Sequence, residues 1–419
     1  MGNTICTPPN RASTYGREVD VKASAESVHP MPSSVAVTIA IKAQLAISTS
    51  IDNSLRKEKF EHSRRAKILL LGGADAGKST ILKQMRILHM TGFSELEMHS
   101  FYNYLRFNVF EIFHEIAMGV QENILAVSED EKLMIYRFAE GISWFIGIED
   151  EIETQYLLNF LEFESVQTFM KLHPNYASLP DNAHYYLPKL HKLLAPEHIP
   201  TAEDILHLRI PTTGISEINF EFSANAIRLI DVGGQRTYRK KWIHCFDGVA
   251  AVLFVASLAA YDQALEGVDI DSKPVLHRDL FPPVQLSEVR DSTNEEYEKR
   301  VNRLRDSVKL FGEMLRCRFL RSSSFILFLN KTDLFAKKLP LSPLSEHFSS
   351  YDGTTNEQAS EYLKDQFLKR KSKNDTERTL YSHYTCATDT NNVEFVFKAA
   401  CDIVFQRNLH TTGAMKCVQ

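Results

Sequence analysis

The sequence has few cysteines, and none of them forms a CxxC pair. The six cysteines in the 419 residues are scattered without regular spacing. Disulfide scaffolds and zinc sites depend on closely spaced cysteines, so neither is expected here. We therefore expect the chain to work in a reducing, cytosolic compartment.

A long apolar run and an excess of positive charge are also missing. The longest apolar stretch near the start, residues 34–47, is interrupted by Lys42 and Gln44 and is shorter than the ~20 residues that cross a bilayer. It neither follows a basic segment nor precedes a cleavage site, which argues against a secretory signal. The net charge of -5 provides no broad basic surface, so nucleic acid is not expected as a partner.

What the chain does contain is enough apolar sequence for a large core. Hydrophobic residues make up 44% and charged residues 24%, as in globular proteins, and the length exceeds that of one ordinary domain. The patterns predict a disordered tail (1–33), an N-terminal helix (34–65), an α/β domain in two pieces (66–92 and 208–419) with an insertion at about 267–290, and an all-helical insert (93–207).

A phosphate-binding loop is predicted between a strand and a helix. The apolar run Lys67–Leu71 indicates a buried strand, and the apolar positions from Ile81 to Leu88 have helical spacing. Between them, Gly72-Gly-Ala-Asp-Ala-Gly-Lys-Ser79 matches G-x-x-x-x-G-K-[ST] in the context that this motif requires. Backbone N–H groups would hold phosphate oxygens, Lys78 would add a positive charge, and the Ser79 hydroxyl would bind Mg²⁺.

A second group of residues follows the apolar run 227–230. In Asp231-Val-Gly-Gly-Gln235, the carboxylate would hold Mg²⁺ through water, Gly234 would let the backbone approach a γ-phosphate, and Gln235 would orient the attacking water. On its own, a D-x-x-G motif is a weak signal, and an ordinary tight turn explains it better than a nucleotide site. Beside the phosphate loop, the catalytic interpretation is favoured.

The choice of base is predicted by the end of another strand. Asn330-Lys-Thr-Asp333 closes the apolar run 325–329, and Asp333 would accept hydrogen bonds from the ring N–H and exocyclic amine of guanine. Adenine has no matching donors and would leave the carboxylate unpaired. In Thr385-Cys-Ala-Thr388, the N–H of Ala387 would reach the guanine carbonyl. A helix follows at 393–409, where Asn391 and Glu394 resemble a capping box.

These segments resemble the heterotrimeric G-protein α subunits. Together with Arg209, Thr212-Thr-Gly214 and the run Arg236-Thr-Tyr-Arg-Lys-Lys-Trp-Ile-His-Cys-Phe246, they occur in the order found in that family. Small Ras-like GTPases lack the helical insert, the internal arginine and the last of these runs. The resemblance implies an α/β Ras-like P-loop GTPase domain, a mostly parallel sheet flanked by helices, with an inserted all-helical domain.

The resemblance also implies roles for particular residues. Gln235 and Arg209 would be catalytic, Arg209 acting as a built-in arginine finger, and Mg²⁺ would be held by Ser79, Thr212 and, through water, Asp231. GTP or GDP would contact residues spread over the two domains: Asp75, Ala76, Gly77, Lys78, Ser79, Thr80, Asn182, Leu206, Arg209, Thr212, Gly234, Asn330, Lys331, Asp333 and Ala387.

Partners and location are implied in the same way. A βγ dimer would bind the N-terminal helix and the segment 236–242, a seven-helix receptor would bind the C-terminal helix, and an effector of unknown identity would read the GTP state. Gly2 is placed for myristoylation and Cys6 for palmitoylation, although the acylation motif prefers Ser or Thr at position six. The lipids would hold the protein at the cytoplasmic face of the plasma membrane.

The phosphate loop departs from the family, which typically has glycine, glutamate and serine where this chain has Ala74, Asp75 and Ala76. A methyl group at Ala74 is expected to slow hydrolysis, and the shorter Asp75 to loosen the hold on Arg209. His207 and Pro211 stand where the family often has arginine and lysine. Two alternatives remain: a GTP-bound scaffold or pseudo-GTPase with little turnover, and a P-loop ATPase, against which Asp333 argues.

Overall fold

The computed structural model describes residues 42, 45–54, 65–123, 127–140, 150–174, 176, 178–195, 197–223, 225–265, 302–372 and 378–411. The chain forms two compact units, residues 1–62 and 63–419. In the first, residues 45–54 are helical and fall within the predicted helix 34–65. The predicted tail 1–33 and the insertion 267–290 lie outside the described residues. Everything that follows concerns the second unit.

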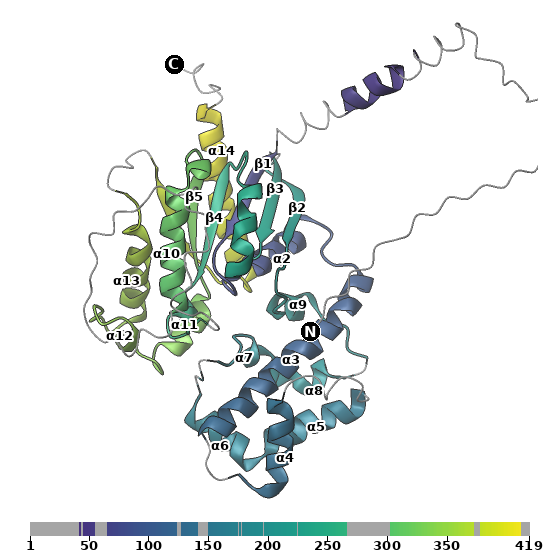
Figure 1. The fold of residues 1–419 in the computed structure, drawn as a ribbon, viewed down its shortest axis with the longest axis vertical. Helices are drawn as coiled ribbons and strands as arrows, with labels where there is room; N and C mark the ends of the chain where they lie inside the picture. Colours follow the sequence, from purple (N-terminus) through teal and green to yellow (C-terminus); the bar gives the residue numbers. More distant parts are fainter. Residues whose placement is uncertain are drawn as a thin grey trace, which may run out of the picture. The chain divides into compact units, whose positions relative to one another are not determined.

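A six-stranded sheet forms the centre of this unit, in the order β2-β3-β1-β4-β5-β6 (Figure 1). β2 pairs antiparallel with β3, and every other pair is parallel. The inner strands are almost wholly apolar and buried because helices cover both of their faces. The strands are β1 (Ala66–Leu71), β2 (Ile215–Phe222), β3 (Asn225–Val232), β4 (Ala251–Ser257), β5 (Ser324–Asn330) and β6 (Leu380–Tyr384).

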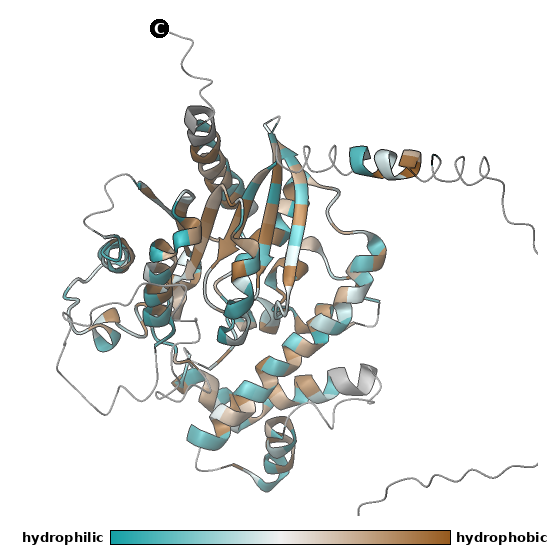
Figure 2. Ribbon diagram, turned by 45° about the horizontal axis from the view of Figure 1, so that its top comes forward, coloured by the Kyte–Doolittle hydropathy of each residue, from teal (hydrophilic) through white to brown (hydrophobic). Residues whose placement is uncertain are grey.

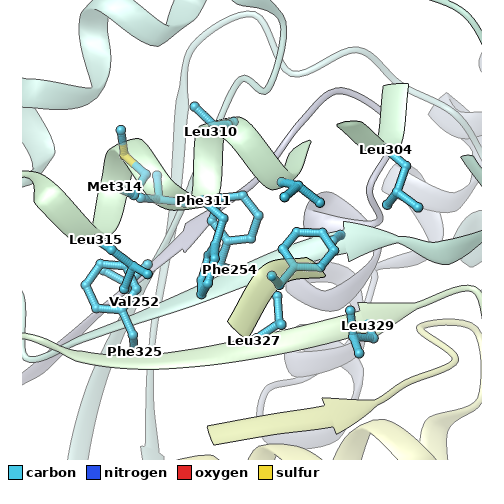
Figure 3. Close-up of a cluster of buried hydrophobic side chains, with 14 of the residues drawn as sticks. Val252, Phe254, Leu304, Leu310, Phe311, Met314, Leu315, Phe325, Leu327 and Leu329 are labelled. Atoms are coloured by element: carbon cyan, nitrogen blue, oxygen red, sulfur yellow. The ribbon is translucent and has the colours of Figure 1, made fainter. Parts of the chain in front are cut away.

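Two helical layers cover the sheet. On one face, α2 (Lys78–His89) and α14 (Thr390–Thr411) pack on β1, β3 and β5. On the other, α10 (Arg303–Arg316) and α13 (Asn356–Leu368) bury an aromatic cluster in which the rings of Phe254 and Phe311 are 4.9 Å apart (Figure 3). Figure 2 shows that the strands of the sheet are mostly hydrophobic, whereas the helices around them carry hydrophobic and hydrophilic residues. The smaller elements here are η3 (Arg236–Cys245), η4 (Leu258–Ala260), η7 (Arg318–Leu320), α11 (Thr332–Lys338) and α12 (Leu344–His347).

The predicted helical insert is observed, and its described residues contain no strand. Its own core is aromatic, with the rings of Phe113, Phe138 and Phe160 between 4.6 and 5.7 Å apart. No described helix is both long and apolar enough to span a membrane. The helices are α3 (Glu95–Asn123), α4 (Glu129–Ala139), α5 (Asp150–Glu162), α6 (Glu164–Leu172), α7 (Ala183–Tyr186), η2 (Leu187–Lys189), α8 (Leu190–Leu193) and α9 (Ala202–His207).

Two helix starts show how local sequence positions the segments near the site. α9 begins at a complete capping box in which the Thr201 and Asp204 side chains each accept the other's backbone N–H. The capping box predicted for α14 at Asn391 is wrong. That helix begins at Thr390, and Asp389 before it accepts from the N–H of Asn392 at 3.1 Å, because an aspartate just ahead of the helix reaches its free N–H groups first.

Candidate nucleotide-binding site

A cavity of about 970 Å³ lies where the strands end. Its walls come from the segments after β1, β3, β5 and β6 and, across from them, from the helical insert around Asn182 and Leu206. The carboxyl ends of parallel strands are where α/β folds bind ligands. Every residue that the sequence predicts to contact nucleotide lines this cavity, and so does Gln235.

The phosphate loop is held in shape from within. Lys78 is buried, and its Nζ donates to the carbonyls of Gly72 at 3.2 Å and Gly73 at 2.7 Å. Burial lowers the pKa of Lys78, although the Asp231 carboxylate acts in the opposite direction. Gly77 has φ +100°, and a Cβ there would lie 2.1 Å from Asn330 Nδ2, so only glycine fits. The loop can therefore turn its N–H groups and the start of α2 toward an anion.

Three oxygen-bearing side chains meet beside this loop. Ser79 Oγ lies 2.7 Å from Thr212 Oγ1 and 2.5 Å from Asp231 Oδ2, and Thr212 Oγ1 lies 3.3 Å from the same carboxylate oxygen. The other oxygen, Asp231 Oδ1, is buried without a hydrogen-bond partner. Burial raises the pKa of this carboxyl, with Lys78 opposing the shift. Two hydroxyls and an unsatisfied carboxylate oxygen are a donor set that fits Mg²⁺.

The segment after β3 passes close to the phosphate loop. A Cβ at Gly234 would lie 2.4 Å from both the Gly73 carbonyl and Lys78 Nζ, so the backbone can approach only because this residue is glycine. Gln235, the next residue, is exposed to the cavity at the start of η3. Farther along, Arg239 Nη2 donates to Asp306 of α10 at 2.8 Å. The segment that carries Gln235 is thus anchored to the sheet's helical layer.

Arg209 is paired with the phosphate loop. Its Nε and Nη2 atoms donate to Asp75 Oδ1 and Oδ2 at 3.0 and 2.9 Å, and Arg303 Nη2 donates to Oδ2 at 2.9 Å. Burial alone would raise the pKa of Asp75, but the two guanidinium groups outweigh it and hold that pKa well below its usual range. The expected loose contact at Asp75 is therefore not what the structure shows: the shorter carboxylate reaches both arginines.

The residues predicted for base recognition divide into two roles. Asp333 lines the cavity. Asn330 is buried and connects two loops: its Nδ2 donates to the Ala76 carbonyl at 2.9 Å, and its Oδ1 accepts from the Ala387 N–H at 2.9 Å. Its side chain therefore positions the phosphate loop and the loop after β6, so that Asp333 and Ala387 face one cavity.

The helical insert closes the cavity from the other side. Lys331 Nζ donates to Asp181 Oδ2 at 2.5 Å, and Gln263 Nε2 donates to Asp181 Oδ1 at 3.4 Å. The Asn182 side chain lines the cavity, yet its Nδ2 donates to Asn108 and to the His207 carbonyl, at 3.0 and 3.1 Å. A nucleotide can be enclosed between two lobes, the α/β domain and the helical insert.

No motif marks three polar residues of this region: Gln263 and Arg303, which line the cavity, and Asn108, which bonds to Asn182 and to the Arg209 backbone. Gln263 precedes the predicted insertion at about 267–290, and Arg303, the first residue of α10, follows it; neither belongs to a motif. Asn108 stands in the middle of an amphipathic helix, where a polar residue on the buried face was the one available signal.

The comparisons with known proteins agree with this geometry. Residues 46–404 match the family model for the G-protein alpha subunit. The chain is 36% identical over 374 residues, 87% of its length, to the guanine nucleotide-binding protein alpha-5 subunit of Caenorhabditis briggsae, and the match covers 96% of that protein. The alpha-5 and alpha-16 subunits of Caenorhabditis elegans are also 36% identical, each over 87% of this chain and 95% of the relative. The chain therefore belongs to the G-protein α-subunit family, guanine-nucleotide-binding switches that signal with βγ dimers and receptors.

Proposed function

We propose that this chain is an active GTPase that hydrolyses Mg²⁺-bound GTP to GDP and uses the reaction to end its signalling state. The observation that carries the proposal is the convergence of Lys78, Gln235, Arg209 and the Ser79–Thr212–Asp231 oxygen cluster on one cavity. These are the charge-neutralising and water-positioning groups that phosphoryl transfer requires.

Each group has a distinct part in the reaction. Lys78 and the loop N–H groups bind the β- and γ-phosphates, and a bound Mg²⁺ would neutralise charge that develops on them. Gln235 orients water opposite the leaving group. Arg209 stabilises the charge on the leaving phosphate, the role known for the internal arginine of this family. Because Asp75 holds Arg209 in the described arrangement, the guanidinium must leave or share that carboxylate to act.

Guanine specificity is assigned to Asp333. Asp333 lines the cavity, where its carboxylate would accept hydrogen bonds from the guanine N–H groups. Changing Asp333→Asn replaces one acceptor by a donor, which matches the extra carbonyl of xanthine. Competition binding with GDP, ADP and xanthosine diphosphate tests this. We expect GDP over ADP in the unchanged protein and a shift toward xanthosine diphosphate in the variant; equal binding of ADP and GDP by the unchanged protein would point to the ATPase alternative.

The cellular setting completes the proposal. The N-terminal helix and the segment 236–242 would bind a βγ dimer, the end of α14 a seven-helix receptor, and the GTP state an effector. Acyl groups on Gly2 and Cys6 would hold the complex at the cytoplasmic face of the plasma membrane, because one chain alone gives only marginal binding. Mass spectrometry of the protein from eukaryotic cells tests both sites.

A second function is favoured by one residue of the phosphate loop. Ala74 stands where the family has glycine and lines the same cavity as Gln235 and Arg209, so its methyl group would hinder their convergence on the γ-phosphate. With turnover blocked, the protein would be a GTP-bound scaffold. Phosphate release from GTP, with ATP and with chelated Mg²⁺ as controls, separates the two: the GTPase releases phosphate only from Mg²⁺–GTP, and the scaffold retains intact GTP.

A further inference from the structure

One buried polar side chain of the helical insert reaches the backbone of Arg209. Asn108 lies on α3 and is 1% exposed. Its Oδ1 accepts from the Arg209 N–H at 2.6 Å, and its Nδ2 donates to the Arg209 carbonyl at 2.9 Å. One amide group therefore satisfies both backbone groups of the predicted catalytic arginine.

These bonds fix a stretch that has no secondary structure of its own. α9 ends at His207 and β2 begins at Ile215, so Arg209 has no helical or ladder partners for its backbone. The Asn108 amide bonds to the Arg209 N–H and carbonyl, as the backbone of a paired strand would. Its orientation is determined by chemistry, because the Arg209 N–H needs an acceptor and the carbonyl needs a donor.

The surroundings make the contact rigid. Asn182 Nδ2 donates to the same Asn108 Oδ1 at 3.0 Å and to the His207 carbonyl at 3.1 Å. Lys83 Nζ donates to the Leu208 carbonyl at 2.9 Å. The backbone on both sides of the Arg209 Cα atom is thus held by side chains from elsewhere in the fold, whereas the Arg209 side chain is part-exposed and paired with the carboxylates of Asp75, at 2.9 Å, and Glu111, at 3.7 Å.

We propose that Asn108 is a positioning residue for GTP hydrolysis: it fixes the backbone of Arg209 so that the guanidinium reaches the leaving phosphate from a set pivot. Asn108 is not among the residues that line the cavity, so its proposed action is through the Arg209 backbone. The inference rests on the proposed function, since it needs Arg209 to act in hydrolysis. A long side chain turns a small rotation of its backbone into a larger shift at its end, and a misplacement of about 1 Å can cost about a hundredfold in rate.

The competing explanation is that Asn108 only stabilises the core of the insert. Both explanations predict a lower melting temperature for Asn108→Ala, because the Arg209 backbone groups lose their partner. They differ in one respect. If Asn108 acts through Arg209, its effect on hydrolysis must vanish when the guanidinium is absent, while its effect on stability remains.

The test is a double-mutant cycle on full-length protein with Asn108→Ala, Arg209→Ala and both together. Hydrolysis is followed in a single turnover of preloaded GTP after Mg²⁺ addition, which separates it from binding, and melting temperature is measured alongside. The matched control is Asn103→Ala, the same change at an exposed position of the same helix.

We expect Asn108→Ala to slow single-turnover hydrolysis by about ten- to a hundredfold. In the Arg209→Ala background the same change should alter the rate by less than about twofold, with the same fall in melting temperature. Asn103→Ala should match the unchanged protein in both. If Asn108→Ala does not fold, Asn108→Ser, which keeps a polar group, takes its place. Its effect on the hydrolysis rate is again compared between the unchanged and the Arg209→Ala backgrounds.

Two results would overturn the inference: unchanged hydrolysis in Asn108→Ala, or an equal loss in both backgrounds. The outcome for Arg209→Ala alone is informative separately. If that single variant hydrolyses GTP at the unchanged rate, the role proposed for Arg209 fails, and the inference about Asn108 fails with it.

Discussion

Arg209 and Asp75 form a bidentate ion pair, with Nε–Oδ1 and Nη2–Oδ2 distances of 3.0 and 2.9 Å. The pair joins the segment that follows α9 to the phosphate loop. Bidentate contacts between arginine and carboxylate are among the stronger polar interactions in proteins. The same guanidinium is proposed to act on the leaving phosphate, so the Asp75 carboxylate competes with the nucleotide for it.

Removing the charge at Asp75 is expected to speed the release of GDP. Asp75→Asn keeps the size of the side chain and weakens its bonds to Arg209 and Arg303, which help to close the cavity. Release should become about tenfold faster, corresponding to the loss of one charge-assisted hydrogen bond. Fluorescent GDP displaced by excess GTP measures the rate. Asp75→Glu, which keeps the charge, is the control, and an unchanged rate in Asp75→Asn would show that the pair does not close the site.

The second contact between the lobes should behave in the same way. Asp181→Asn removes the charge that Lys331 Nζ contacts at 2.5 Å, and we expect GDP release to become a few-fold faster. Because ion pairs weaken in salt, release from the unchanged protein should accelerate more with added salt than release from the variant. Asp130→Asn, an exposed aspartate of α4, is the matched control. Identical salt dependence in both proteins would contradict this account of the contact.

Replacing Ala74 is expected to increase the rate of hydrolysis. Ala74→Gly removes a methyl group from the wall of the cavity that Gln235 also lines, and single-turnover hydrolysis should rise by about tenfold with little change in GTP affinity. Quenched-flow measurement of phosphate gives the rate. Ala202→Gly, the same change at an exposed position outside the cavity, is the matched control and should leave the rate unchanged. Equal rates for Ala74→Gly and the unchanged protein would show that the Ala74 methyl group does not slow hydrolysis.

His207 gives the fold a dependence on pH. Its ring stacks on Tyr185 with centroids 3.7 Å apart, and burial lowers the pKa of His207, although its bond to the Glu203 carbonyl partly opposes the shift. The unfolded chain therefore binds this proton first as pH falls, so stability is lost from about pH 6.5 downward. Melting curves between pH 7.5 and 5.5 should fall more steeply for the unchanged protein than for His207→Gln. Parallel curves would exclude this effect.

The sequence predicts those parts of the fold in which a motif directly adjoins the strand or helix that positions it. The strand before Gly72, the helix after Ser79 and the strand before Asn330 follow from apolar runs and their spacing, and the structure confirms them. The contacts that join the lobes could not be predicted. Asn108–Arg209 and Lys331–Asp181 are separated by 101 and 150 positions, and Arg303–Asp75, within the α/β domain itself, by 228. No periodicity relates residues that only the folded chain brings together.

The most direct test of the account is single-turnover hydrolysis of Mg²⁺–GTP by the purified protein beside Gln235→Leu and Arg209→Ala, with nucleotide retention followed in parallel. We expect the unchanged protein to convert bound GTP to GDP, and each variant to lose about a hundredfold or more in rate with GTP still bound. Tight retention of GTP without conversion in the unchanged protein would contradict it and would identify a GTP-bound scaffold.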